Sequence, residues 1–184
     1  SLTKIMTAIV AIENISDLEE KVPVPKEALE GLAAKNAMVV GLKVGEEVTF
    51  RDLLYGVLLP SGADATGTIA YYVSGNEENY VKLMNEKAQE LNLSSTHFSD
   101  TSGLDDQNNY SSVKDVSILL QYALKNEEFK KIFTSQEYLM SNGTVLKSTL
   151  VYYTEKFALD NKYIYGSKTG FTTIAGFCLA SIAE

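Results

Sequence analysis

The sequence predicts a mixed α/β (α+β) fold, in which an antiparallel sheet carries flanking helices and an inserted helical lobe. Three patterns predict it: an apolar helix at the start, amphipathic helices in the middle and alternating strands at the end. The chain has 184 residues, 45% apolar and 22% charged, which is typical of a soluble globular protein. We expect one domain over 1–184, with a helical lobe at about 49–133 and a sheet-forming part at about 134–184.

The first predicted element is a helix over residues 1–12 that is apolar on nearly every face. Such a helix is normally buried at the centre of a domain. Lys4 is its only charge before Glu13. A buried lysine is costly unless it has a partner or a chemical role, so Lys4 is a candidate functional residue.

The middle of the chain is predicted to begin irregularly and then become helical. Short strands are expected at 22–25, 38–41 and 43–45. Thr49 and Asp52 resemble a capping box for a helix that Pro60 stops, and Asp64 is expected to cap a second helix that ends near Val73. An amphipathic helix is expected over 77–91.

The last third is predicted to change from helices to strands. Ser112 with Asp115 indicates the start of a helix ending near residue 126, and a short helix follows at 128–133. From Glu137 onwards we expect strands. Asn142-Gly143 predicts a type I′ hairpin turn, and the final strands are expected at 163–172 and 176–182.

Composition excludes several classes of function. A net charge of −8 argues against a nucleic-acid partner. One His and one Cys cannot make a structural zinc site, Cys178 cannot form an internal disulfide, and we expect no metal or cofactor. No apolar run reaches the length of a membrane span. His97 has no G-x-S-x-G elbow beside it and is expected to pack or cap, so a catalytic base would not be histidine.

Ser1 and Lys4 form an S-x-x-K pair. Residues three apart share one face of a helix, and a desolvated lysine can take the proton of a serine hydroxyl. The pattern alone is common, and a snorkelling lysine is the structural alternative. A second copy, Ser111 to Lys114, lies in a polar segment where capping explains it better.

Lys168-Thr169-Gly170 lies within a predicted strand near the end of the chain. A cation and a hydroxyl beside a glycine suit a substrate carboxylate, although an isolated K-T-G is more often an ordinary turn. A phosphate-binding loop is excluded because Ser167 separates Gly166 from Lys168 and a strand follows.

The motifs taken together resemble the penicillin-recognising serine transferases and hydrolases. The resemblance is strongest to serine-type D-alanyl-D-alanine carboxypeptidases, the low-molecular-mass penicillin-binding proteins, and it extends over most of the chain. The matching segments are Ser1-Leu2-Thr3-Lys4-Ile5-Met6-Thr7-Ala8, Leu58-Leu59-Pro60-Ser61-Gly62-Ala63-Asp64-Ala65, Leu83-Met84-Asn85, Thr96-His97-Phe98, Ser102-Gly103-Leu104 and Gly166-Ser167-Lys168-Thr169-Gly170-Phe171.

The resemblance implies a β-lactamase/transpeptidase-like fold and a role for each matching residue. Ser1 would be the acylated nucleophile, Lys4 its base, and Ser61 a proton relay to the leaving amine. The K-T-G strand would bind substrate, with Lys168 and Thr169 on the terminal carboxylate, Gly170 beside them and the backbone N–H of Phe171 completing an oxyanion hole with that of Ser1.

The resemblance also implies partners and a location. The substrate would be a peptidoglycan stem peptide ending in D-Ala-D-Ala, and β-lactams would acylate Ser1. The protein would act outside the cytoplasm, secreted or held by a membrane anchor outside this chain. In the family, strands precede the nucleophile and more structure follows K-T-G, so we expect the chain to be truncated at both ends.

One position departs from the family pattern. Ala63 stands where the S-x-N motif has Asn, and Ser74-Gly75-Asn76 does not replace it because that segment follows the next helix. A weakly active or non-catalytic penicillin-recognition module is therefore an alternative. A class A β-lactamase is disfavoured because Val81 replaces the Glu of its E-x-x-L-N loop. A nucleophile activated by its own α-amine would leave Lys4 unexplained.

Overall fold

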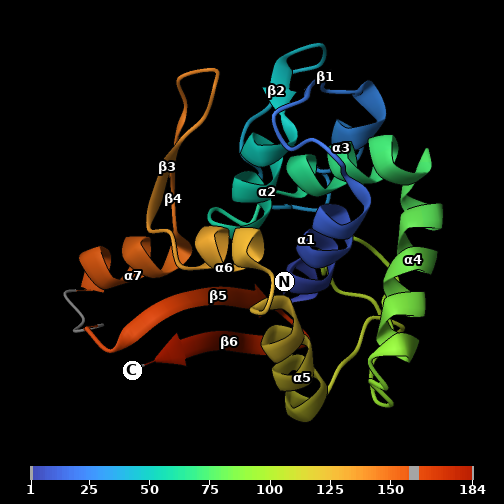
Figure 1. Ribbon diagram of the computed structural model, residues 1–184, viewed down its shortest axis with the longest axis vertical. Helices are drawn as coiled ribbons and strands as arrows, with labels where there is room; N and C mark the ends of the chain where they lie inside the picture. The colour runs from blue at the N-terminus through green and yellow to red at the C-terminus, as the bar shows by residue number, and fades with distance from the viewer. Residues whose placement is uncertain (1, 158–161, 184) are drawn as a thin grey trace.

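The computed structural model describes residues 2–157 and 162–183. Its helices and strands alternate along the chain, with helices concentrated in the middle (Figure 1). They are α1 (Thr3–Asn14), β1 (Lys21–Pro23), the 3₁₀ helix η1 (Lys26–Leu29), β2 (Glu47–Thr49), α2 (Phe50–Leu58), α3 (Ala63–Ser74), α4 (Glu77–Glu90), α5 (Val113–Ala123), α6 (Glu127–Phe133), β3 (Glu137–Leu139), β4 (Val145–Lys147), α7 (Thr149–Phe157), β5 (Ile164–Thr172) and β6 (Gly176–Ala183).

Helix α1 lies at the centre of the molecule, as its apolar sequence predicts. Every residue from Thr3 to Ala11 is buried. Helices α2, α3, α4, α5 and α6 all contact it, and Figure 1 shows them arranged around it. Burial on all sides makes α1 a rigid platform for the residues at its N-terminal end.

Side-chain caps begin several helices where the sequence predicts them. Thr49 and Asp52 form the expected capping box of α2, with two reciprocal hydrogen bonds of 3.0 Å. The Ser112 hydroxyl accepts from the N–H of Asp115 at the start of α5. Asp52 also accepts from Tyr138 and Ser141, so the α2 cap holds the β3–β4 hairpin against the helical part.

Within residues 2–157 and 162–183, the strands form three antiparallel pairs, β1–β2, β3–β4 and β5–β6. The β5–β6 hairpin is the longest and pairs Lys168 with Ala180. Gly166 is required by close packing, since a Cβ there would lie 2.8 Å from the carbonyl oxygen of Phe133 in α6. This contact seats β5 against the helical part (Figure 1).

The predicted strands at 38–41 and 43–45 are wrong, and so is the predicted cap role of Asp64. The N-cap of α3 is Gly62. The Asp64 carboxylate instead accepts the N–H groups of Val40, Gly41 and Leu42 at 2.8–3.0 Å. A segment whose N–H groups are held by a carboxylate cannot also pair as a strand.

Two predictions for the last third are also wrong. The hairpin turn is not type I′, because Gly143 has φ +86° whereas Asn142 does not have a positive φ. The N–H of Met140 donates to the carbonyl of Thr144 at 2.8 Å, so the turn consists of residues 141–143, with glycine in the left-handed position. Helix α7 was expected to be strand. Its β-branched and aromatic residues favour strands, but none of its residues is buried, and Tyr152 and Tyr153 are exposed.

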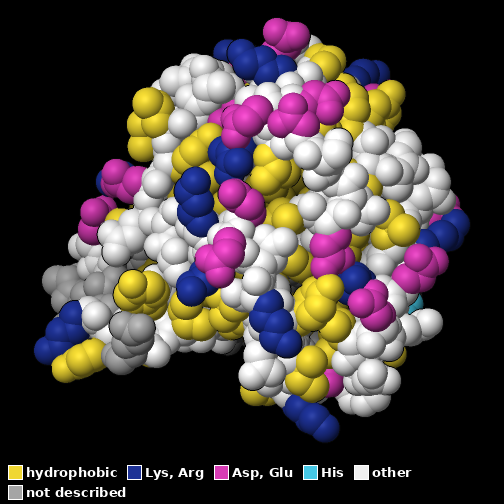
Figure 2. Space-filling model, viewed as in Figure 1, with side chains coloured by type: hydrophobic (Ala, Val, Ile, Leu, Met, Phe, Trp, Pro, Cys, Tyr) yellow, Lys and Arg dark blue, Asp and Glu magenta, His cyan; other side chains and the backbone are white. Residues whose placement is uncertain are grey.

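The visible surface mixes charges of both signs with scattered apolar side chains (Figure 2). Acidic side chains gather toward the top of this face, around β1, β2 and α3. This distribution agrees with the net charge of −8. No helix in the described part of the chain is long and apolar enough to cross a membrane.

Candidate active site

Two lysines are buried near the N-terminal end of α1. Lys4 is 3% exposed and Lys168 is fully buried. Burial lowers the pKa of Lys4 to about 8 and the pKa of Lys168 to about 7, and the charge of Lys4 adds to the lowering at Lys168. This electrostatic coupling places the two amines in one site, although 164 positions separate them in the sequence.

The Lys4 amine donates a hydrogen bond to the carbonyl oxygen of Ser102. Two carboxylates, Asp100 and Asp64, raise the pKa of Lys4 and partly oppose the effect of burial. The pKa of Lys4 therefore stays at about 8, and burial does not hold the amine permanently in its neutral form. A lysine with such a pKa can exchange a proton at physiological pH.

The loop that supplies the Ser102 carbonyl is fixed by hydrogen bonds from both sides. Asp100 accepts the N–H groups of Ser102 at 2.8 Å, Gly103, and Leu104 at 3.0 Å. Thr101 is fully buried, and its carbonyl accepts from the Thr7 hydroxyl of α1 at 2.7 Å. The sequence singled out Ser102-Gly103-Leu104 only by resemblance and missed Asp100.

Ser61 lies in the turn between α2 and α3. It is 4% exposed and has a left-handed backbone, φ +70°. A non-glycine residue in this conformation is uncommon and is often found at functional sites. Gly62 is required beside it because a Cβ there would lie 2.6 Å from Val40 and 2.8 Å from Asp64.

The K-T-G strand faces the same region. The Lys168 amine donates to the carbonyl of Thr169 at 2.9 Å. The Thr169 hydroxyl is hydrogen-bonded to the Thr149 hydroxyl at 2.5 Å, and the Thr149 N–H donates to the carbonyl of Leu59 at 3.2 Å. Thr149, at the start of α7, thus links the K-T-G strand to the turn that carries Ser61. Sequence reasoning missed it because that segment was expected to be strand.

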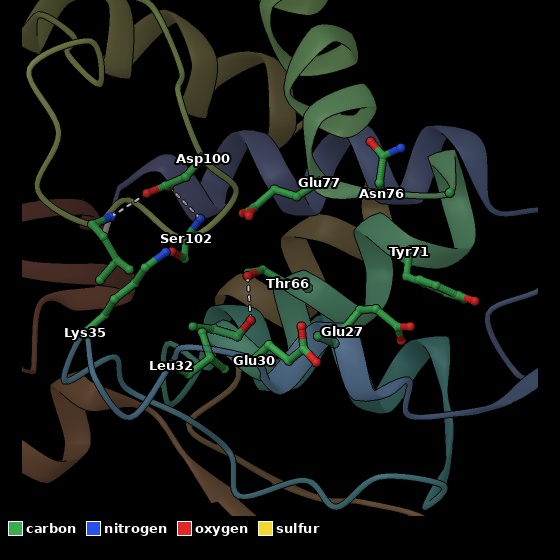
Figure 3. Close-up of a pocket in the computed structure, with 15 residues that line it drawn as sticks. Glu27, Glu30, Leu32, Lys35, Thr66, Tyr71, Asn76, Glu77, Asp100 and Ser102 are labelled. Carbon is green, nitrogen blue, oxygen red and sulfur yellow. Dashed lines mark hydrogen bonds between the residues drawn. The ribbon is translucent and has the colours of Figure 1, made fainter.

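Two hollows border the Ser102–Leu104 loop. One, of about 770 Å³, is lined by the start of α1, helix α5 and the β5–β6 hairpin, including Leu2, Gly170 and Phe171. The other, of about 290 Å³, is lined by Ala63, Ser102 and several acidic side chains. Figure 3 shows Asp100, Ser102 and Thr66 around this smaller cavity, with Glu27, Glu30 and Glu77 at its edge. Leu104 lines both hollows, so the loop separates them.

The structure brings most of the candidate residues together. Lys4 and Lys168 are electrostatically coupled, Thr169 is linked through Thr149 to the Ser61 turn, and Gly170 and Phe171 border the same hollow as Leu2. Ser1 lies outside the described residues. His97 is exposed and hydrogen-bonds the carbonyl of Asn108, which fits the structural role expected of it.

This set of segments matches a known family over the whole of residues 1–184, described as D-alanyl-D-alanine carboxypeptidase (peptidase family S11). The chain belongs to this family. The D-alanyl-D-alanine carboxypeptidase DacF of Bacillus subtilis is 34% identical over 184 residues, which are 100% of this chain and 47% of the relative. This carboxypeptidase-family chain therefore spans about half the length of that relative.

Solved structures agree with the family assignment. The Streptomyces K15 DD-transpeptidase superposes with a TM-score of 0.86 at 30% identity, covering 100% of this chain and 74% of that one. A D-alanyl-D-alanine carboxypeptidase from Mycobacterium tuberculosis H37Rv superposes with a TM-score of 0.85 at 28% identity, covering 100% and 67%. The expected penicillin-binding type of fold is thereby confirmed.

Proposed function

We propose that the protein is a serine DD-carboxypeptidase that removes the terminal D-alanine from peptidoglycan stem peptides through an acyl-enzyme on Ser1. The observation that carries this proposal is the pair of buried, coupled lysines, one at the start of the nucleophile helix and one in the K-T-G strand. Burying two like charges together is costly, and the cost is understandable if the two amines have different chemical tasks.

In the proposed reaction Lys4 takes the proton of the Ser1 hydroxyl as its oxygen attacks the carbonyl of the penultimate D-alanine. The tetrahedral oxyanion is held by the backbone N–H groups of Ser1 and Phe171. The C–N bond then breaks, and Ser61 relays a proton to the leaving amine of D-alanine. Water hydrolyses the resulting ester and regenerates Ser1.

Lys168 and Thr169 are proposed to bind the terminal carboxylate, with Gly170 allowing close approach. A carboxylate beside Lys168 favours its charged form, and this positive charge in turn favours a neutral Lys4. The productive state therefore holds a single proton on the pair, located on Lys168. Binding of a carboxylate-terminated peptide promotes this state and prepares Lys4 to act as base.

A weakly active or non-catalytic penicillin-recognition module is the second candidate, and Ala63 favours it. Ala63 is 3% exposed and lines the 290 Å³ cavity, so no side-chain amide from this position reaches the site. Such a module would be labelled by penicillin without turning over peptide. We favour the enzyme because the missing amide leaves Lys4, Ser61 and Lys168 in place.

The proposed substrate and inhibitors place the protein at the cell wall. Peptidoglycan lies outside the cytoplasm, so we propose an extracytoplasmic location, with β-lactams as acylating inhibitors. We also propose that residues 1–184 form one catalytic domain, because the residues assigned to the reaction come from α1, the α2–α3 turn and β5.

The test is release of D-alanine from an acyl-D-Ala-D-Ala peptide, measured for the wild type and for Ser1→Ala. We expect release by the wild type and none by the variant. Release by Ser1→Ala would contradict the mechanism. Penicillin labelling without any peptide turnover by the wild type would support the recognition module instead.

A further inference from the structure

Asp100 is a carboxylate of the site for which the proposed reaction has no direct use. It lies in the loop after α4, and its side chain points back onto its own loop (Figure 3). One carboxylate oxygen accepts from Ser102 at 2.8 Å and from Gly103, and the other accepts from Leu104 at 3.0 Å. Both oxygens are therefore occupied by backbone N–H groups, and Gly103 takes the positive φ of +75° that this turn requires.

The carbonyl at the centre of this turn is the one that Lys4 contacts. The Lys4 amine donates to the oxygen of Ser102, whose N–H is held by Asp100. The Ser102 carbonyl shares one planar peptide unit with the N–H of Gly103, which also donates to Asp100. The Asp100 carboxylate, by holding this N–H, fixes the direction of the carbonyl. The four-carbon stem of lysine is flexible, and a fixed acceptor restricts where its nitrogen lies.

The neighbouring residue Thr101 is held independently of Asp100. Its N–H and hydroxyl both donate to Glu77, at 3.1 and 2.7 Å, and its carbonyl accepts from Thr7 at 2.7 Å. These contacts dock the loop on α1 and α4. Loss of the Asp100 carboxylate would consequently free the Ser102–Leu104 turn without releasing the whole loop.

We propose that Asp100 is a positioning residue for acylation: its carboxylate shapes the Ser102–Leu104 turn so that the Ser102 carbonyl holds the Lys4 amine at the reaction centre. This inference rests on the proposed function of Lys4 as base. Asp100 acts through Ser102 and Lys4 and does not itself contact the reacting atoms.

Asp100 also acts on Lys4 through its charge. The charged groups that act on the Lys4 amine in the described part of the chain are Asp100, Asp64 of α3 and Lys168 of β5. Asp100 is the larger of the two influences that raise the pKa of Lys4. Acylation needs a neutral Lys4, so the pKa of Lys4 helps to set the acid limb of the pH–rate curve. Removing the Asp100 charge lowers the pKa and moves that limb to lower pH.

The experiment measures the rate of acylation by penicillin against pH for the wild type, Asp100→Asn and Asp100→Ala, with intact-mass detection of the adduct. In Asp100→Asn the amide oxygen can still accept from Ser102 and Gly103, so we expect a modest loss in maximal rate and an acid limb at lower pH. In Asp100→Ala we expect the same shift and a loss on the order of 30-fold, because the turn is no longer held.

Asp115→Asn is the matched control. Asp115 is buried, whereas Asp100 is partly exposed; like Asp100 it accepts a backbone N–H, from Ser95 at 2.8 Å, but it does not act on Lys4. We expect lower thermal stability and an unchanged pH–rate curve for this variant. Circular dichroism and the thermal midpoint of each variant give its folded fraction, to which each rate is normalised.

Two results would overturn the inference. An unchanged acid limb in Asp100→Asn, or a rate for Asp100→Ala that matches the wild type once corrected for folded fraction, would reduce Asp100 to a structural residue. A wild type that penicillin does not acylate would remove the proposed function itself, and the inference with it. The behaviour of the wild type therefore tells the two failures apart.

Discussion

The chain contains the S-x-x-K spacing twice, and the two copies differ in everything except that spacing. Lys4 lies in a helix buried on all sides, with its amine on the Ser102 carbonyl and near two carboxylates. Lys114 is exposed at the start of α5, where Ser112 caps the helix. Burial lowers the pKa of Lys4 to about 8, whereas the second copy meets solvent.

Both copies have the S-x-x-K spacing, but only burial of the lysine gives it a pKa at which it can act as a base. An exposed lysine is a protonated, solvated cation at neutral pH and cannot act as a base. A desolvated one loses part of its preference for the charged form. The apolar helix sequence around Lys4 was the visible sign of this difference.

The largest expected effect separates the two copies directly. Lys4→Met removes the proposed base, and we expect acylation by penicillin to fall about 10³-fold, the range of a positioned general base. Lys114→Met should leave the acylation rate unchanged. The thermal midpoint of Lys4→Met at pH 7 checks that the variant is folded, because the substitution removes a buried charge but also takes the donor from the Ser102 carbonyl. Equal losses in the two variants would contradict the claim that Lys4, and not Lys114, acts as the base.

Lys168 is also buried, and replacing it tests whether a buried lysine in this site can bind the substrate carboxylate instead of acting as the base. Lys168→Met should lower kcat/KM for D-Ala-D-Ala peptides about 30-fold through loss of the carboxylate contact. A peptide whose terminal carboxylate is replaced by an amide should be a poor substrate for the wild type and lose little further in the variant. If both peptides lose equally, Lys168 does not bind the carboxylate.

Because Lys4 and Lys168 influence each other's charge, we predict a pH dependence of kcat/KM that the exposed Lys114 could not produce. Below about pH 7 both amines are charged, and above about pH 8 both are neutral. Between these values the pair holds one proton, which a bound carboxylate draws to Lys168, so that Lys4 is left able to accept a proton. We expect kcat/KM for D-Ala-D-Ala peptide to be bell-shaped with its maximum between these values, both limbs belonging to the pair. A rate that is flat from pH 6 to 9 would contradict this coupling.

The smallest expected effect concerns Ala63. Its side chain borders the 290 Å³ cavity, so the larger Asn can be accommodated in Ala63→Asn. A restored amide contact is worth about 1 kcal/mol, so we expect kcat/KM for peptide to rise about fivefold. Ala63→Val is the control that adds volume without the amide. A rise in both variants, or in neither, would mean that the amide is not what the site lacks.

The residues that could be predicted from the sequence are those whose signal is local. The apolar run placed α1 and Lys4, the Thr49–Asp52 spacing placed the start of α2, and alternation placed β5 and β6. These elements agree with the structure because periodicity and capping act over a few neighbouring residues.

The rest depended on contacts distant in sequence. Asp64 captures the backbone of residues 40–42, which removes the strand that local pattern predicts there. Asp100 and Thr149 carry no motif of their own and act through Ser102 and Thr169. A prediction from local sequence patterns cannot detect partners that are distant in the sequence. The residues that match motifs were therefore found, and the residues that support them were missed.

The most direct test of Ser1 as the nucleophile is to incubate the wild type with penicillin, measure the intact mass and map the adduct by peptide sequencing. We expect one penicilloyl group per chain, located on Ser1, and no adduct in Ser1→Ala. An adduct on Ser111 or Ser61, or labelling that persists in Ser1→Ala, would contradict the assignment of the nucleophile.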